Sequence, residues 1–161
     1  MDLSLGTLRI LDKNELTPAD KLAVLNLWNN EYPINLRYHD VKEFENYLQA
    51  LEDKSHALLL DDNDRVLGWY FDFIRDKKRW FAAILDSEIQ GKGYGSKLIK
   101  RAMKSRKELH GWVIDSDAYL KNNGQAYRSP LSFYKKLGFK IDASVRLETS
   151  RLSAVKIFWT L

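Results

Sequence analysis

The sequence predicts a single α/β domain, residues 1–161, with a mixed and mostly antiparallel sheet of about seven strands. Three observations support this prediction. The chain is long enough for one domain with a substantial core, and 45% of its residues are hydrophobic. Segments with apolar residues at helical spacing alternate with short apolar runs that are typical of strands. A glycine-rich turn at residues 90–96 joins one of these runs to an amphipathic segment.

The N-terminal part predicts one strand followed by two helices. The strand is expected at residues 7–11, where apolar and polar residues alternate. Thr17 and Pro18 are the expected N-cap and first residue of the first helix, which should end before Pro33. A second helix is expected over residues 41–51, where apolar residues recur at helical spacing.

Three further strands, joined by short polar turns, predict an antiparallel meander at residues 56–60, 66–74 and 80–85. These runs are apolar at nearly every position. We therefore expect helices on both faces of this part of the sheet.

The rest of the chain completes the fold. The expected elements are a basic amphipathic helix from Ser96 to Leu109 that Gly111 ends, a strand at residues 112–114, a polar loop at 115–129, a short helix at 131–137, and a hairpin of strands at 139–147 and 155–161.

The composition excludes several classes of function. The chain has no cysteine, which removes disulfides, cysteine zinc sites and a cysteine nucleophile, and its three histidines are scattered, so we expect no metal site. There is no apolar run long enough to span a membrane. Residues 1–5 lack the features of a signal peptide, so we expect a cytoplasmic location. The net charge of +4 permits anionic partners without requiring nucleic acid.

The turn Gln90–Ser96 carries the clearest chemical signal. Glycines allow positive φ and a close approach of the backbone to a ligand. The free N–H groups and the dipole of the following helix favour an anion such as a phosphate. An ordinary connection between a strand and a helix is the alternative for this turn taken alone.

Two motifs together resemble the GNAT superfamily of acyl-CoA N-acyltransferases. The pyrophosphate motif Gln/Arg-x-x-Gly-x-Gly/Ala is matched by Gln90, Gly93 and Gly95. The motif Phe-Tyr-x-x-x-Gly-Phe is matched by residues 133–139, and the order of the predicted elements agrees over nearly the whole chain. The resemblance implies a pair of central strands that splay apart.

The resemblance also implies acetyl-CoA as the cosubstrate and a set of residues that bind it. The turn would hold its pyrophosphate, and its pantetheine arm would pair with the end of strand 80–85 like an added strand. The family often has an asparagine where this chain has Tyr127 and a small residue where it has Pro130, so Asn122 or Asn123 is expected to take over one contact. The cofactor-binding residues implied are Ile84, Leu85, Gln90, Gly91, Lys92, Gly93, Tyr94, Gly95, Ser96 and Asn122.

For catalysis, the resemblance assigns Tyr134 as the group that protonates the departing thiolate, and a backbone N–H near Leu85 as the donor that polarises the thioester carbonyl. A core position is the alternative for Tyr134. Without cysteine, a route through an acyl-cysteine is impossible, so direct attack by the amine in a ternary complex is favoured. Asp72 is the first candidate base, because burial among aromatic side chains disfavours a charged carboxylate and suits proton uptake. Glu31, His39 and an ordered water are alternatives, and a structural role is the alternative for Asp72.

These expectations describe an acetyl-CoA-dependent N-acetyltransferase whose acceptor is a primary amine of a small molecule or a protein. Its acceptor pocket should be built by residues 28–39, the strand around Asp72 and the hairpin near residues 146–151. A module that only binds or senses acyl-CoA is the first rival. A nucleic-acid binder using the basic face from Lys97 to Lys107 is the second. The resemblance is also compatible with a homodimer through the terminal strands.

Overall fold

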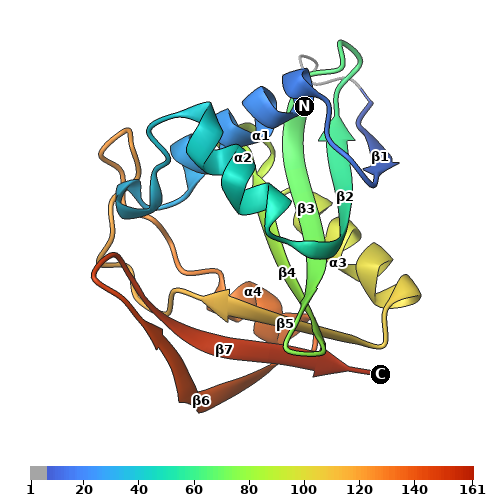
Figure 1. The fold of residues 1–161 in the computed structure, drawn as a ribbon. Coiled ribbons are helices and arrows are strands. Elements are labelled where there is room, and N and C mark those ends of the chain that lie inside the picture. Colours follow the sequence, from blue (N-terminus) through green and yellow to red (C-terminus); the bar gives the residue numbers. More distant parts are fainter. Residues whose placement is uncertain (1–6) are drawn as a thin grey trace.

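The structure, a computed structural model, describes residues 7–161 and contains seven strands in one sheet (Figure 1). Residues 1–5, from which we expected no signal peptide, lie outside the described residues. The strands are β1 (Arg9–Lys13), β2 (Glu52–Leu60), β3 (Val66–Arg75), β4 (Lys78–Leu85), β5 (Glu108–Val113), β6 (Lys140–Glu148) and β7 (Ser153–Thr160). The helices are α1 (Pro18–Glu31), α2 (Val41–Gln49), α3 (Tyr94–Ser105) and α4 (Leu131–Lys136), with short 3₁₀ helices η1 (Ile34–Leu36) and η2 (Ser87–Ile89).

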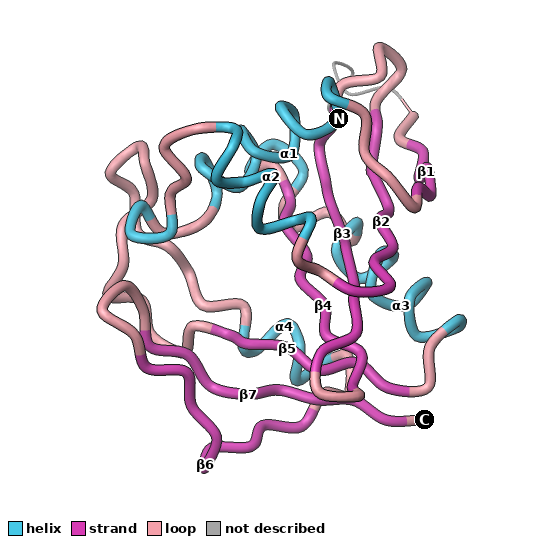
Figure 2. Tube along the Cα trace, viewed as in Figure 1, coloured by secondary structure: helices cyan, strands magenta, loops and turns pink. Residues whose placement is uncertain are grey.

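The sheet has the order β1-β2-β3-β4-β5-β7-β6. Every neighbouring pair is antiparallel except β4 and β5, which are parallel. The mixed, mostly antiparallel sheet is therefore confirmed. Figure 2 shows β4 and β5 diverging, so that the strands β1–β4 and the strands β5–β7 form two wings.

The alternation of side chains along β3 explains why both faces are covered. Trp69, Phe71 and Phe73 belong to the core between the sheet and the helices α1 and α2. Tyr70, which points the other way, belongs to the core beneath α3 and α4. A strand that is apolar on both faces needs a helical layer on each, as predicted.

The start of α1 follows from local chemistry. The Thr17 side chain accepts a hydrogen bond from the backbone N–H of Asp20 (3.1 Å), and the Asp20 carboxylate accepts one from the backbone N–H of Thr17 (2.9 Å). This reciprocal pair is a capping box, with Pro18 at the first helical position. The predicted N-terminus of this helix is confirmed.

The predicted end of the helix after the glycine turn is wrong. The helix α3 ends at Ser105, and Leu109 and Gly111 lie in β5. Gly111 does not end a helix: a Cβ there would lie 3.0 Å from Cε1 of Phe81, so its absence allows β5 to approach β4 closely. Shifts of one to three residues separate most other predicted and observed boundaries.

Within residues 7–161, no helix combines the length and apolar content needed to cross a membrane.

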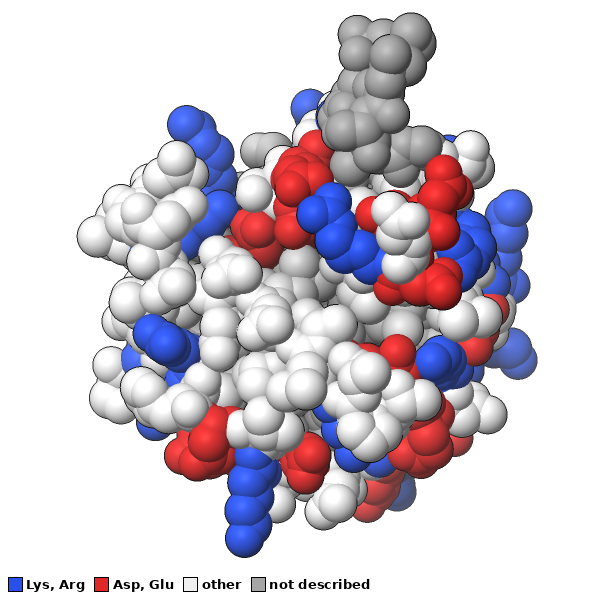
Figure 3. Space-filling model, turned by 90° about the horizontal axis from the view of Figure 1, so that it is seen from above, with Lys and Arg blue, Asp and Glu red and all other residues white. Residues whose placement is uncertain are grey.

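Charged side chains are unevenly distributed over the surface of the molecule. Residues 22–30 of α1 carry no charged side chain, and the face seen in Figure 3 has a broad central area without Lys, Arg, Asp or Glu.

Candidate active site

The site begins where β4 and β5 separate. These strands pair only at Trp80 and His110. The backbone N–H of Asp86 donates to the carbonyl of Leu67 on β3 (2.8 Å). Because hydrogen-bonding groups alternate along a strand, the backbone groups of Leu85 and Ala83 point the opposite way, toward the gap that β5 leaves. The end of β4 is therefore an open edge, whereas the backbone groups of Ile84 face β3.

The glycine turn lies directly after this edge. Gly91 and Gly93 have φ of 76° and 90°, which is the left-handed region, and a Cβ at either would have no heavy atom within 4 Å. The side-chain amide of Gln90 donates to the carbonyl of Leu85 (2.8 Å) and so ties the turn to the strand edge. The turn is held close to β4 and has open space above both glycines.

The N-terminus of α3 completes this wall. The first backbone bond of the helix runs from the N–H of Lys97 to the carbonyl of Gly93 (3.2 Å), so the N–H groups at positions 94–96 have no partner within the helix. At Gly95 a Cβ would lie 3.2 Å from Leu85 and 3.2 Å from Phe133. Glycine at this position therefore allows the helix to pack closely on β4 and α4.

A cavity of about 550 Å³, here called the turn cavity, follows this surface. It is lined by Glu31, Tyr32, Ala83, Ile84, Leu85, Gln90, Gly91, Gly93, Gly95, Ser96, Ile99, Tyr127, Arg128, Pro130, Phe133 and Tyr134. Seven of the ten predicted cofactor-binding residues are in this lining. Arg128 is an addition that the sequence did not indicate, because no regular pattern marks its position in the loop.

Three predicted cofactor-binding residues lie outside this lining. Lys92 is exposed in the turn. Tyr94 packs against the cluster that contains Leu67, beneath the Nζ of Lys97 (5.3 Å from the ring centre). Asn122 is exposed, and its side-chain oxygen accepts a hydrogen bond from Arg37 (3.4 Å).

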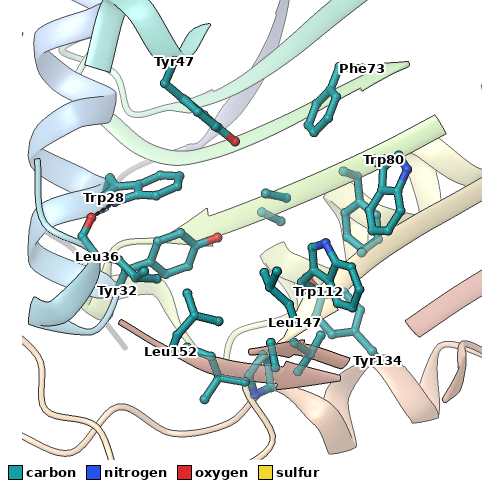
Figure 4. Close-up of a pocket in the computed structure, with 18 of the residues that line it drawn as sticks. Trp28, Tyr32, Leu36, Tyr47, Phe73, Trp80, Trp112, Tyr134, Leu147 and Leu152 are labelled. Carbon is teal, nitrogen blue, oxygen red and sulfur yellow. Dashed lines mark hydrogen bonds between the residues drawn. The ribbon is translucent and has the colours of Figure 1, made fainter. Parts of the chain in front are cut away.

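A second cavity, of about 540 Å³ and here called the aromatic cavity, opens on the face that α1 and α2 cover (Figure 4). Its lining is Trp28, Tyr32, Leu36, Tyr38, Tyr47, Phe73, Arg75, Asp76, Trp80, Phe81, Ala82, Ala83, Gly111, Trp112, Val113, Ile114, Tyr127, Pro130, Tyr134, Leu147, Leu152 and Ala154. The predicted segments 28–39 and 146–151 both reach this lining, through Trp28 to Tyr38 and through Leu147. The contributions of Tyr47, Trp80 and Trp112 were not predicted.

Tyr134 lies where the two cavities meet. It lines both of them, together with Tyr32, Ala83, Tyr127 and Pro130. Its ring packs edge-on against Phe81 (5.6 Å between centroids) and Phe139 (5.3 Å), which fixes its position. Burial raises the pKa of the Tyr134 phenol above its ordinary value, so the hydroxyl is protonated at neutral pH, as a proton donor has to be.

The structure does not bring Asp72 to either cavity. The carboxylate of Asp72 accepts hydrogen bonds from the Tyr70 hydroxyl (2.6 Å), from Arg106 (2.9 and 3.0 Å) and from Arg79 (3.3 Å). Strand alternation places it on the face of β3 that α3 covers, where it borders a separate space of about 70 Å³. Two guanidinium groups neutralise this carboxylate, and the position supports the structural alternative.

The other two candidate bases differ. Glu31 borders the turn cavity, but both of its oxygens are used: one pairs with Nζ of Lys121 (3.0 Å), and the other accepts from the backbone N–H of Ser87 (2.9 Å). His39 is exposed and lines neither cavity. Glu31 therefore holds the loop of residues 115–129 against α1.

Comparison with known proteins agrees with this geometry. A family profile described as "Acetyltransferase (GNAT) domain" matches residues 53–141, which is more than half of the chain. The chain belongs to the GNAT acetyltransferase family. It is therefore assigned to the acyltransferases, as the two motifs predicted. No curated protein sequence matches it at a significant level.

Solved structures of N-acetyltransferases share its fold. The ribosomal-protein-S18-alanine N-acetyltransferase from Escherichia coli has a TM-score of 0.67 at 14% identity, covering 96% of this chain and 94% of that one. The phosphinothricin acetyltransferase from Sinorhizobium meliloti in complex with AcCoA has a TM-score of 0.64 at 15% identity, covering 98% of this chain and 89% of that one. Spermidine/spermine N-acetyltransferase SpeG from Vibrio cholerae has a TM-score of 0.61 at 16% identity, covering 95% of this chain and 92% of that one. At these identities the likeness shows the fold alone.

Proposed function

We propose that this chain is an acetyl-CoA-dependent N-acetyltransferase that transfers an acetyl group to a primary amine. The observation that carries the proposal is the position of Tyr134 at the meeting point of the two cavities. One cavity leads to the glycine turn, and the other to an aromatic chamber. A donor in the first and an acceptor in the second would meet at this phenol.

The residues of the turn cavity fit acetyl-CoA. The open space over Gly91 and Gly93, and the three N–H groups at the start of α3, suit a pyrophosphate. The exposed guanidinium of Arg128 makes no hydrogen bond or ion pair within residues 7–161 and supplies a further cation at this cavity. A structural neighbour of the same family was solved with AcCoA. The same set of donors would bind longer acyl-CoA thioesters.

Acetyl-CoA supplies the chemistry of a thioester, whose carbonyl carbon an amine can attack. The backbone N–H groups of Ala83 and Leu85 face the gap and can donate to the carbonyl oxygen. As the nitrogen bonds to the acyl carbon and the C–S bond breaks, the sulfur takes a proton from the hydroxyl of Tyr134. The amine releases one proton, and the balance closes when Tyr134 is reprotonated.

The acceptor amine must lose its proton to solvent or to an ordered water. Asp72 lies on the other face of β3, and Glu31 is held by Lys121 and Ser87. An apolar cavity also favours the neutral form of an amine, which reduces the need for a strong base.

The test measures binding and turnover separately. Calorimetric titration gives the affinity for acetyl-CoA, and a thiol reagent follows CoA release with a panel of amines, including a polyamine, an amino acid, an aromatic amine and a peptide. Amine-dependent CoA release with an acetylated product of the expected mass is the predicted result. Tight binding of acetyl-CoA with no transfer to any acceptor would instead support the binding or sensor module, and absence of binding would overturn the proposal.

Binding of nucleic acid has little support from the charges. On the basic helix α3, Arg101 pairs with Asp12. Arg106, the first residue after the end of α3, pairs with Asp72. Figure 3 shows basic and acidic side chains interspersed around the uncharged area, with no single basic patch on that face. Salt-independent or undetectable binding to RNA and DNA is therefore expected.

A further inference from the structure

The walls of the aromatic cavity are two groups of rings that face each other. On one side, Trp28 packs against Tyr47 (5.8 Å between centroids) and Tyr38 (5.4 Å). On the other, Trp80 and Trp112 stack at 5.3 Å with an interplanar angle of 29°. Figure 4 shows the space between these two groups. Aromatic rings on both sides suit an apolar, ring-bearing body better than a polar chain.

Three polar groups point into this space. Figure 4 shows the hydroxyls of Tyr32 and Tyr47 and the indole nitrogen of Trp112 directed into the cavity. None of the three makes a hydrogen bond within residues 7–161. By contrast, the indole of Trp28 donates to the carbonyl of Leu36 (2.9 Å) and is already used. All three residues are partly exposed, so these polar groups face open space and are available to a ligand.

The cavity carries almost no charge. Among the described residues that line it, the charged ones are Arg75 at the end of β3 and Asp76 next to it. Burial raises the pKa values of the Tyr32 and Tyr47 phenols, so both remain neutral. The lining near the junction therefore offers no carboxylate to an ammonium group.

Asp76, which lies beside Arg75 and away from the junction, is the one carboxylate among the described lining residues, so the cavity disfavours polycationic acceptors. Removing an ion from water costs several kcal/mol even after relaxation. The attraction of a cation to an aromatic face returns only about 0.5–2 kcal/mol. An acceptor with one amino group, which can be neutral when it reacts, avoids most of this cost.

The dimensions fit a small molecule. Along β4, Ala83 at the junction with the turn cavity lies five positions after Lys78, the partner of Arg75. At a rise of about 3.3 Å per residue, this is a length of roughly 17 Å. A volume of about 540 Å³ is in the range for a drug-sized ligand.

Resting on the proposed acetyl transfer, we propose that the acceptor is a small molecule with an aromatic ring and one primary amino group on a short alkyl chain. The ring lies between the Trp28–Tyr47 wall and the Trp80–Trp112 wall. The amino group reaches Tyr134 at the junction of the cavities. Polyamines and peptide N-termini are the acceptors that this arrangement disfavours.

The first experiment compares primary amines, with each rate corrected for the fraction of the amine that is neutral at the assay pH, because a peptide N-terminus (pKa about 7.7–8.0) is less basic than an alkylamine. We expect kcat/KM for CoA release to be at least tenfold higher with 2-phenylethylamine than with butylamine, spermidine or a phenylalanine-initiated peptide. A preference for spermidine or for the peptide would overturn the acceptor assignment while leaving acetyl transfer intact. If no amine supports transfer, tryptophan fluorescence and calorimetric titration with 2-phenylethylamine still decide the assignment, because absence of saturable binding would overturn it.

The second experiment changes the cavity. Ala82→Leu fills it from β4 and should lower kcat/KM for 2-phenylethylamine at least tenfold, with unchanged affinity for acetyl-CoA. Leu152→Glu places a carboxylate in the lining and should raise the ratio of spermidine to phenylethylamine turnover at least tenfold.

Ser150→Glu is the matched control, because it adds the same charge in the same turn at an exposed position outside the lining. It should leave that ratio unchanged. Equal ratios in the two glutamate variants, or full phenylethylamine activity in a folded Ala82→Leu variant, would contradict the proposal.

Discussion

Replacing Asp72 with asparagine separates its structural role from the catalytic role that the sequence suggested. We expect Asp72→Asn to destabilise the protein strongly while leaving the turnover of each folded molecule unchanged. The Asp72 side chain is 2% exposed and is shared by Arg79 and Arg106. Asparagine keeps the shape but removes the charge that these guanidinium groups face.

The magnitude follows from burial and chain length. Breaking a buried ion pair by removing one partner costs about 3–5 kcal/mol. With an unfolding entropy of about 2.1 cal/mol/K per residue, 161 residues give about 0.34 kcal/mol/K. The expected fall in Tm is therefore about 9–15 °C.

The assay combines scanning calorimetry with CoA release at a temperature where the variant is folded. The matched control is Asp12→Asn, which breaks the ion pair with Arg101 at a side chain that is 62% exposed. Exposed pairs contribute at most about 1 kcal/mol, so the control should lower Tm by no more than about 3 °C. An unchanged Tm together with a hundredfold loss of turnover in Asp72→Asn would refute the reasoning and restore Asp72 as the base.

Three further predictions test other parts of the structure. Tyr134→Phe should lower kcat about 100-fold or more with unchanged acetyl-CoA affinity by titration, and an unaltered rate would assign the proton to another donor. Gly93→Val should lose acetyl-CoA binding, because φ at this position is 90° and the side chain would enter the ligand space; a strain of about 1–2 kcal/mol leaves the fold intact by circular dichroism. Burial lowers the pKa of His56 to about 4, compared with about 6.5 in the unfolded chain. The free energy of unfolding, measured by denaturant titration, should therefore fall by up to about 1.4 kcal/mol per pH unit as pH decreases from 6.5 to 4. The fall should be less steep in His56→Gln.

The parts of the fold that the sequence predicts well depend on local chemistry. Thr17 and Asp20 satisfy each other's backbone groups within one helical turn, so the start of α1 is visible in four residues. The same holds for Gly91 and Gly93, whose positive φ is the reason for a glycine at each position.

The sequence is least informative where residues far apart in it decide the outcome. Gly111 suggested a helix end, but it is a glycine because Phe81, thirty positions earlier, packs against it. The run around Asp72 is apolar, which suggested a carboxylate among aromatic rings, yet Arg79 and Arg106 converge on it from β4 and from the end of α3. Neither arginine can be connected to Asp72 without knowing the register of the strands and the position of that helix end.

The same distinction separates the donor side of the site from the acceptor side. Backbone groups in one turn and one strand edge form the turn cavity, so a short motif encodes it. Side chains from α1, α2, β4 and β5 form the aromatic cavity, and only the folded sheet brings Trp28, Tyr47, Trp80 and Trp112 together. Because these rings lie outside Gln90–Ser96 and residues 133–139, substitutions among them can change the acceptor without altering either motif. The acceptor must therefore be inferred from the shape and charge of the cavity, which here favour a ring-bearing molecule with one primary amino group.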